Sequence, residues 1–212
     1  MKNIFFPLFI FLLVSCNGSG SGPAPTGDSM SKKDSVKKAL SEDLPPPDEI
    51  HQFDWFYSAF SKALIDWNDT SLNICINPQS GLWVIDAPGA MPHFTKVMND
   101  SLLKVLFRRS AIPLDKDHMM VDPKPEALPK VDCSKKGFYD KLGCYTTETN
   151  TFKEEKIWNY ASLTPKDEDA VIRSAGTITR TVVNTDIGKF YFSLIDGKWY
   201  LTFLDIRKPC TA

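Results

Sequence analysis

The first strong hydrophobic pattern in the globular part of the chain is helical and follows three consecutive prolines. Residues 48–67, "DEIHQFDWFYSAFSKALIDW", place an apolar side chain at every third or fourth position. This spacing predicts one helix with a single apolar stripe, and Asp48 is suited to be its N-cap. Trp55 lies opposite the stripe, so we expect another part of the chain to cover it in preference to a partner. The stripe consists of Ile50, Phe53, Tyr57, Phe60, Leu64 and Trp67.

The segment after this helix alternates apolar and polar side chains. Leu72, Ile74 and Ile76 are separated by polar residues or cysteine, a pattern that predicts a half-buried strand. Prolines and glycines then divide the chain into short pieces. The pieces are predicted to be a strand at 82–85, a short helix at 94–107, an irregular proline-rich excursion at 110–136 and a short strand at 145–149.

The last third of the chain predicts one helix followed by an antiparallel meander. In "TPKDEDAVIRSAG", Thr164 is the expected N-cap, Pro165 occupies the first helical position and Gly176 ends the helix. The hydrophobic period then changes from about four to two, which indicates strands. The strands are expected at 177–184, 189–195 and 198–206.

Asp196-Gly197 is a strong signal for a two-residue hairpin turn between the last two strands. The turn fixes a register that divides the side chains between two faces of the hairpin. We expect the more apolar face to be core and the other to be solvated or to line a pocket. The core pairs are Leu194–Trp199, Phe192–Leu201 and Phe190–Phe203, and the other pairs are Ser193–Tyr200 and Tyr191–Thr202.

This order of elements predicts an α+β fold, in which helices pack on one face of a curved antiparallel sheet. The stretch "FYSAFSKALIDWNDTSLNICINPQSGLWVIDAPGA" resembles the opening of uncharacterised Gram-negative lipoprotein domains. More distantly, it resembles NTF2-like folds. That resemblance implies a cone with a mouth between the sheet and the helices.

The N-terminus has the features of an export signal. Lys2 precedes an apolar run from Ile4 to Val14, which is too short to cross a membrane. Leu13-Val14-Ser15-Cys16 resembles the lipobox of bacterial lipoproteins, and the resemblance implies that Cys16 is lipidated and becomes the mature N-terminus. Asn17 after the cysteine favours the outer membrane by the same analogy. The alternative is an ordinary signal peptide with a cysteine near its cleavage site.

Composition divides the rest of the chain into a linker and one domain. Residues 16–47 are rich in Gly, Ser, Lys and Pro and poor in apolar side chains, so we expect a flexible tether after a signal peptide at 1–15. Residues 48–212 are long enough for one domain with a hydrophobic core. Without Lys2, 24 of the 25 basic residues remain against 26 acidic ones. No basic stripe is present, so nucleic acid is not an expected partner.

Four cysteines beyond Cys16 predict disulfides in an exported protein, with three possible connectivities. Cys133 and Cys144 flank a polar, glycine-containing segment and are the expected pair. Cys75 and Cys210 then pair with each other or stay apart. Their spacing is not that of a zinc site.

The sequence contains few signals of catalysis. It has no nucleophile elbow, HExxH, P-loop, dinucleotide-binding fingerprint or EF-hand loop, and it implies no cofactor. Asp86 and His93 flank "APGAMP" and would form an acid–base pair if a cone mouth brought them together, although a turn-capping Asp86 is the favoured interpretation.

Other charged clusters are weaker candidates. Asp115, His118 and Asp122 are close enough in sequence to suggest a metal site, but solvated side chains are the favoured interpretation. The doublets Arg108-Arg109 and Lys135-Lys136 are expected to be solvated surface.

These observations favour a lipid-anchored envelope protein that binds a protein, a glycan or a small ligand without catalysis. The alternative is a small enzyme with an NTF2-like pocket that uses Asp86 and His93. A purely structural role in an envelope complex is not separable from binding by sequence.

Overall fold

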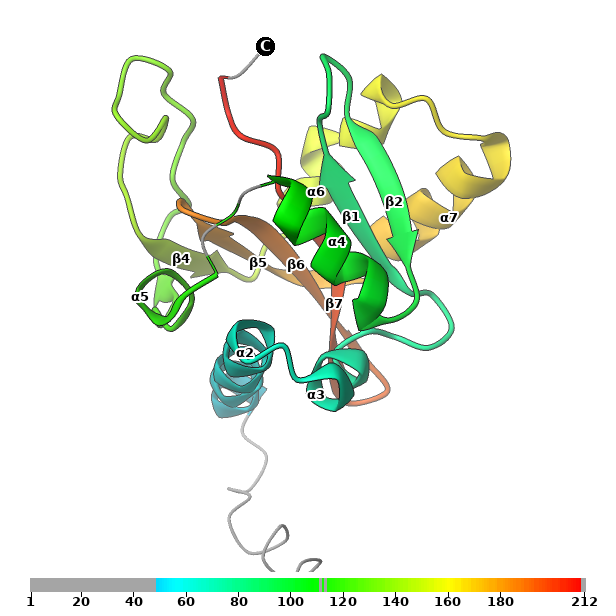
Figure 1. The fold of residues 1–212 in the computed structure, drawn as a ribbon, viewed down its shortest axis with the longest axis horizontal. Helices are drawn as coiled ribbons and strands as arrows, with labels where there is room; N and C mark the ends of the chain where they lie inside the picture. The colour runs from blue at the N-terminus through cyan, green and yellow to red at the C-terminus, as the bar shows by residue number, and fades with distance from the viewer. Residues whose placement is uncertain (1–48, 111, 113, 211–212) are drawn as a thin grey trace, which may run out of the picture. The chain divides into compact units, whose positions relative to one another are not determined.

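The computed structural model describes residues 49–110, 112 and 114–210 (Figure 1). The expected signal peptide, Cys16 and the tether lie outside these residues. In the described part, none of the helices is long and apolar enough to span a membrane.

Seven strands of the described chain form one open sheet in the order β2-β1-β7-β6-β5-β4-β3. The last strand of the chain, β7, lies between β6 and β1 and pairs parallel with β1. The pairs other than β1–β7 and β3–β4 are antiparallel. The strands are β1 (Leu82–Asp86), β2 (His93–Val97), β3 (Lys124–Pro125), β4 (Cys144–Thr147), β5 (Ile178–Asn184), β6 (Gly188–Ile195) and β7 (Lys198–Asp205).

The α+β class is confirmed. Helices cover both faces of this sheet, so the expectation of helices on one face is wrong. Helices α2, α3, α4 and α5 contribute to one hydrophobic core, and α6, α7 and the 3-10 helix η1 contribute to the other. Figure 1 shows α4 and α7 on opposite sides of the β1–β2 hairpin. The helices are α2 (Glu49–Ile65), α3 (Asp69–Ile74), α4 (Asp100–Ser110), α5 (Lys116–Met119), α6 (Thr151–Glu155), η1 (Ile157–Tyr160) and α7 (Pro165–Ala175).

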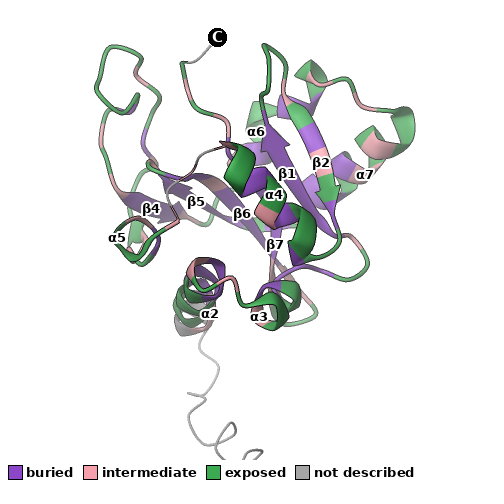
Figure 2. Ribbon diagram, viewed as in Figure 1, coloured by how far each residue is buried: buried purple, intermediate pink, exposed green. Residues whose placement is uncertain are grey.

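The strands are apolar on both sides, which explains the two-sided cover. In β6, Phe190 and Phe192 point into the core under α2, whereas Tyr191 points into the core under α6 and α7. Figure 2 shows β1, β4 and β5 as mostly buried, β2 as partly exposed, and the outer surfaces of the helices as exposed. The space that an NTF2-like cone would leave open beneath α2 is filled by rings such as Phe53 and Phe60, which are 0% and 1% exposed.

Two local predictions were wrong because a short apolar pattern is ambiguous between helix and strand. Residues 69–74 form α3, which starts where the Asn68 side chain accepts a hydrogen bond from the Ser71 amide. Leu72 and Ile76 are buried four positions apart, while Ile74 between them is 70% exposed. Residues 93–97 form strand β2, so the helix predicted at 94–107 begins only at Asp100.

The Asp196-Gly197 hairpin is confirmed, and both residues have positive φ. Its register holds from Leu194–Trp199 to Phe192–Leu201. A bulge between Tyr191 and Phe192 then shifts the pairing by one residue. As a result Phe203 lies opposite Tyr191 in the second core, and the expected Phe190–Phe203 pair does not form. On the face expected to be solvated, Tyr191, Ser193 and Thr202 are buried and Tyr200 is half-buried.

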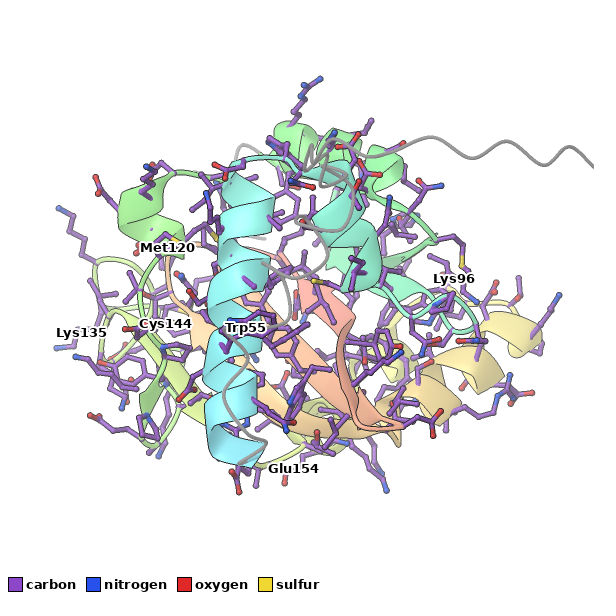
Figure 3. All side chains as sticks on the ribbon, turned by 90° about the horizontal axis from the view of Figure 1, so that it is seen from below. Trp55, Lys96, Met120, Lys135, Cys144 and Glu154 are labelled. Atoms are coloured by element: carbon purple, nitrogen blue, oxygen red, sulfur yellow. A yellow bond between two sulfur atoms is a disulfide. The ribbon has the colours of Figure 1, made fainter. Side chains whose placement is uncertain are left out.

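Aromatic rings make the main contact between α2 and the sheet. The ring of Phe192 meets those of Phe53, Phe56 and Phe60 edge-on, with centroids 5.3, 5.7 and 5.8 Å away. Trp55 lies on the outward side of α2 (Figure 3) and is 57% exposed. We expected another part of the chain to cover Trp55, but the described residues leave it exposed.

We expect Phe192→Ala to lower the free energy of unfolding by about 3–5 kcal/mol, because it leaves a cavity among these rings. The control Trp55→Ala removes an exposed ring and should change it by less than about 0.5 kcal/mol. Denaturant melts of both variants measure this difference. Equal losses would contradict the packing of α2.

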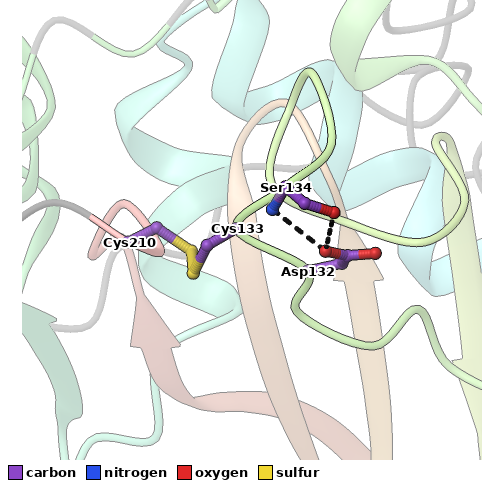
Figure 4. The surroundings of a disulfide bond; sticks show 4 residues. All are labelled: Asp132, Cys133, Ser134 and Cys210. Atoms are coloured by element: carbon purple, nitrogen blue, oxygen red, sulfur yellow. Dashed lines mark hydrogen bonds between the residues drawn. A yellow bond between two sulfur atoms is a disulfide. The ribbon is translucent and has the colours of Figure 1, made fainter.

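The disulfide joins Cys133 to Cys210, with 5.7 Å between the Cα atoms (Figure 4). The expected Cys133–Cys144 bond is wrong, because the fold places Cys133 in a loop and Cys144 in the hydrophobic core. The loop containing Cys133 is closed by its own backbone, with the Asp132 amide donating to the Phe138 carbonyl at 2.9 Å. Cys144 starts β4 and is buried in the core.

Cys75 and Cys144 are buried free thiols. Cys144 Sγ lies 3.5 Å from the Tyr57 hydroxyl, and Cys75 Sγ donates to the Ser71 carbonyl at 3.3 Å. Burial raises the pKa of Cys75 to about 12 and that of Cys144 to about 11. Neither thiol is therefore ionised near neutral pH.

A non-reducing digest should yield a peptide pair linked through Cys133 and Cys210. The Cys210→Ser variant should lose about 2–4 kcal/mol of stability, because the bond restrains a long stretch of unfolded chain. Dithiothreitol should destabilise the wild type and leave this variant unchanged. Recovery of a Cys133–Cys144 peptide, or alkylation of Cys144 in the native protein, would contradict the structure.

Candidate functional site

The parallel pairing of β1 and β7 brings two buried carboxylates to one edge of the sheet. Asp86 ends β1 and Asp205 ends β7, and they are 6% and 4% exposed. The register pairs Ile85 with Asp205, and the Ile206 amide donates to the Ile85 carbonyl at 2.9 Å. Carboxyl ends of neighbouring parallel strands are frequent places for ligand sites.

Asp86 accepts hydrogen bonds on both of its oxygens. Its Oδ1 lies 3.1 Å from Nδ1 of His93, the first residue of β2, which is directly opposite in the register. Its Oδ2 accepts from a terminal nitrogen of Arg109 in the last turn of α4. The structure therefore brings Asp86 and His93 together, as the acid–base alternative requires. It also adds Arg109, which the sequence assigned to solvated surface.

Asp205 holds a second arginine. Arg207 donates to its two oxygens from Nε at 2.8 Å and from a terminal nitrogen at 2.7 Å. Burial opposes the charge of Arg207, but the hydrogen bonds to Asp205 keep its pKa above the ordinary value. Nearby Tyr139 keeps its hydroxyl proton, because burial and the charge of Asp205 raise its pKa to about 12.

The two aspartates and their arginines line a cleft. It consists of two adjoining hollows, of about 200 and 270 Å³, that share Ala87, Arg207 and Lys208. We refer to it as the strand-end cleft. Its lining carries four cationic side chains against the two aspartates. The lining includes Asp86, Arg109 and Ser110 in one hollow and Tyr139, Lys189, Asp205 and Cys210 in the other.

The disulfide holds one wall of this cleft. Cys210 lines the second hollow, and its bond to Cys133 ties residues 206–210 to the excursion. Arg207 and Lys208, which both hollows share, lie in this short segment between β7 and the disulfide. The position of two cleft cations thus depends on the Asp205 ion pair and on the disulfide.

The suggested metal cluster does not assemble in the described residues. Asp115 caps α5 by accepting from the His118 amide at 3.1 Å, and its carboxylate contacts the His118 ring at 2.6 Å. This contact lowers the pKa of Asp115 and raises that of His118. Asp122 does not join them, and no group of three potential ligands occurs among the side chains described. Lys135 and Lys136 lie exposed in the excursion.

The sequence missed Arg109, Asp205, Arg207 and Lys208 as site residues. Each belongs to a segment that is ordinary on its own: the end of a helix, the end of a strand or the residues after a strand. The signal that unites them is the parallel β1–β7 pair, which joins strands more than 100 residues apart. No protein-family model, curated protein or solved structure matches this chain, so its candidate site is defined by geometry alone.

Proposed function

We propose that this chain is a lipid-anchored protein of the bacterial envelope, whose globular domain is a non-catalytic binding module. In this proposal the strand-end cleft holds a small carboxylate between Arg109 and Arg207. The observation that carries it is the pairing of each arginine with a buried aspartate at one edge of the sheet.

Each buried carboxylate orients a guanidinium without using all of its donors. Arg207 uses its Nε and one terminal nitrogen on Asp205, and Arg109 uses one terminal nitrogen on Asp86. A guanidinium has five N–H groups, so both arginines retain donors for a ligand. The Arg109 side chain is 51% exposed. Because a guanidinium matches a carboxylate with two parallel hydrogen bonds, this lining suits an anionic ligand.

The surroundings of Asp86 favour binding over catalysis. A general base must reach a proton of the substrate with a free oxygen. Both oxygens of Asp86 already accept hydrogen bonds, and the residue is buried. His93 is not among the described residues that line either hollow of the cleft. Asp86 is therefore suited to position Arg109.

One contact favours the alternative of a small enzyme. Asp86 lies behind His93, whose side chain is 57% exposed, and an aspartate in this position orients a histidine that acts on a substrate. Under that alternative, His93→Ala abolishes turnover of a bound ligand. Under the binding proposal, neither the wild type nor His93→Ala converts the ligand, and the two bind it with the same affinity.

We expect succinate to bind the purified full-length protein, and Arg109→Gln to weaken its affinity about tenfold, because a charge-assisted hydrogen bond is lost. Arg108→Gln is the matched control, since the neighbouring side chain is exposed and outside the cleft lining. Isothermal titration calorimetry measures both. Equal affinities for the two variants, or no binding of succinate to the wild type, would exclude this cleft as a carboxylate site.

The membrane anchor in this proposal is Cys16, supported by the Leu13–Cys16 lipobox and by Asn17 for the outer membrane. In a Gram-negative host, the wild type should incorporate palmitate and partition into detergent, because two or more acyl chains anchor firmly. Cys16→Ser should do neither, whereas Cys210→Ser should label like the wild type. Labelling of Cys16→Ser at the wild-type level would remove the lipid anchor from the proposal.

A further inference from the structure

A separate hollow lies at the other end of β1, beside α7. It has a volume of about 310 Å³ and shares no described lining residue with the strand-end cleft. The turn that precedes β1 forms one wall, β2 forms another, and the C-terminal half of α7 forms a third. We refer to it as the α7 hollow. Its lining consists of Gln79, Ser80, Lys96, Ala170, Arg173, Ser174, Thr177 and Ile195.

The polar side chains of the α7 hollow are all able to donate hydrogen bonds. They comprise two cations, three hydroxyls and one amide, and none of the described lining residues is acidic. The strand-end cleft differs, because two aspartates accept from its arginines. A lining of donors without a carboxylate is complementary to an anion and unfavourable for a cation.

The two cations of this hollow have no ion-pair partner in the described part of the chain. Several other cations do, including Lys104 with Asp69 and Lys189 with Glu155. Lys96 instead lies over the ring of buried Trp83, with Nζ 5.6 Å from the ring centroid, which is a cation–π contact. Figure 3 shows Lys96 on the side of the molecule where α7 lies. Arg173 is exposed in the last turn of α7.

The turn that forms one wall is held in place before any ligand arrives. The Asn77 side chain accepts from the amides of Gln79 and Ser80, both at 2.9 Å. Gly81 closes the turn with φ +72°, and a Cβ there would lie 2.9 Å from the Val97 carbonyl oxygen. The turn therefore fixes the backbone that carries the Gln79 and Ser80 side chains.

A chain of hydroxyls fixes the opposite wall. Thr177 Oγ1 donates to the Ser174 carbonyl at 2.8 Å, so it accepts from Ser193, whose Oγ is also 2.8 Å away. Thr202 then donates to Ser193 at 2.6 Å. This network holds the end of α7 against β6 and β7. The backbone positions of Arg173 and Ser174 follow from it, so less backbone ordering is needed on binding.

From this geometry we propose that the α7 hollow binds a tetrahedral oxyanion, the phosphate group of a small ligand. Lys96 and Arg173 balance its two negative charges. The Ser80 and Ser174 hydroxyls and the Gln79 amide donate to its remaining oxygens. A phosphate accepts from donors on several sides, whereas a planar carboxylate would leave part of this lining unused. The inference does not depend on the carboxylate site in the strand-end cleft.

The test is a titration of the full-length protein with inorganic phosphate and with glycerol 1-phosphate, followed by NMR. We expect the backbone amide signals of Gln79, Ser80 and Thr177 to shift. Lys96→Gln and Arg173→Gln should each weaken binding about tenfold, because each removes a charge-assisted contact. Lys153→Gln, which changes an exposed lysine on α6, should leave the affinity unchanged.

The outcomes separate the possibilities. Binding of both probes, or of the ester alone, supports a site for a phosphate monoester, and binding of inorganic phosphate alone supports a site for the free ion. Shifts confined to residues of the strand-end cleft would overturn the proposal, as would equal affinities of Lys96→Gln and Lys153→Gln. Thermal melts of the variants check that the fold is retained, since both substituted side chains are exposed.

Discussion

The parallel pairing of β1 with β7 is the interaction on which the rest of this structure depends. It joins the β1–β2 hairpin to the meander of β5, β6 and β7 and makes β7 an interior strand. A parallel pair needs a long crossover connection, and here residues 87–197 lie between the two strands. The same pairing sets Asp86 beside Asp205 and so creates the strand-end cleft. Sheet, core and candidate site therefore share one origin.

Burial on both sides of the sheet follows from that central position. Phe192 packs beneath α2, while Tyr191 and Phe203 pack beneath α6 and α7. The bulge in the β6–β7 pair rotates the residues beyond it, which sends Phe203 to the second core. Some of the polar groups enclosed in this way bond to one another, as in the Ser193–Thr202 pair. A sheet filled on both faces leaves its strand ends as the places where a ligand can approach.

The two ends of β1 differ in how their cations are held. At the carboxyl end, buried aspartates orient Arg109 and Arg207, so the cations there are partly neutralised. At the amino end, Lys96 and Arg173 have no carboxylate partner among the described residues. Lys96 lies over an aromatic ring instead, and Arg173 is exposed. Both arrangements favour anions, but the second leaves more positive charge uncompensated. The proposals for the two ends rest on different residues and can fail separately.

The sequence alone determined the local elements whose signals lie within a few residues. The Thr164 cap predicted α7, and Asp196-Gly197 predicted the last hairpin, because caps and turns depend on neighbouring atoms. The sequence also indicated the class of fold. It did not predict α3, since Leu72, Ile74 and Ile76 fit a strand until the burial of each is known.

Only the tertiary structure decided which distant segments meet. It paired Cys210 with Cys133 and placed Cys144 in the core, although Cys133 and Cys144 are much closer in sequence. It turned Arg109 from an ordinary surface residue into the partner of Asp86. Such contacts depend on the packing of the whole sheet, so the residues next to each partner in the sequence do not predict them. For this protein, short stretches of sequence determine the local hydrogen bonds of caps and turns, whereas the cores, the disulfide and the site arise from long-range pairing.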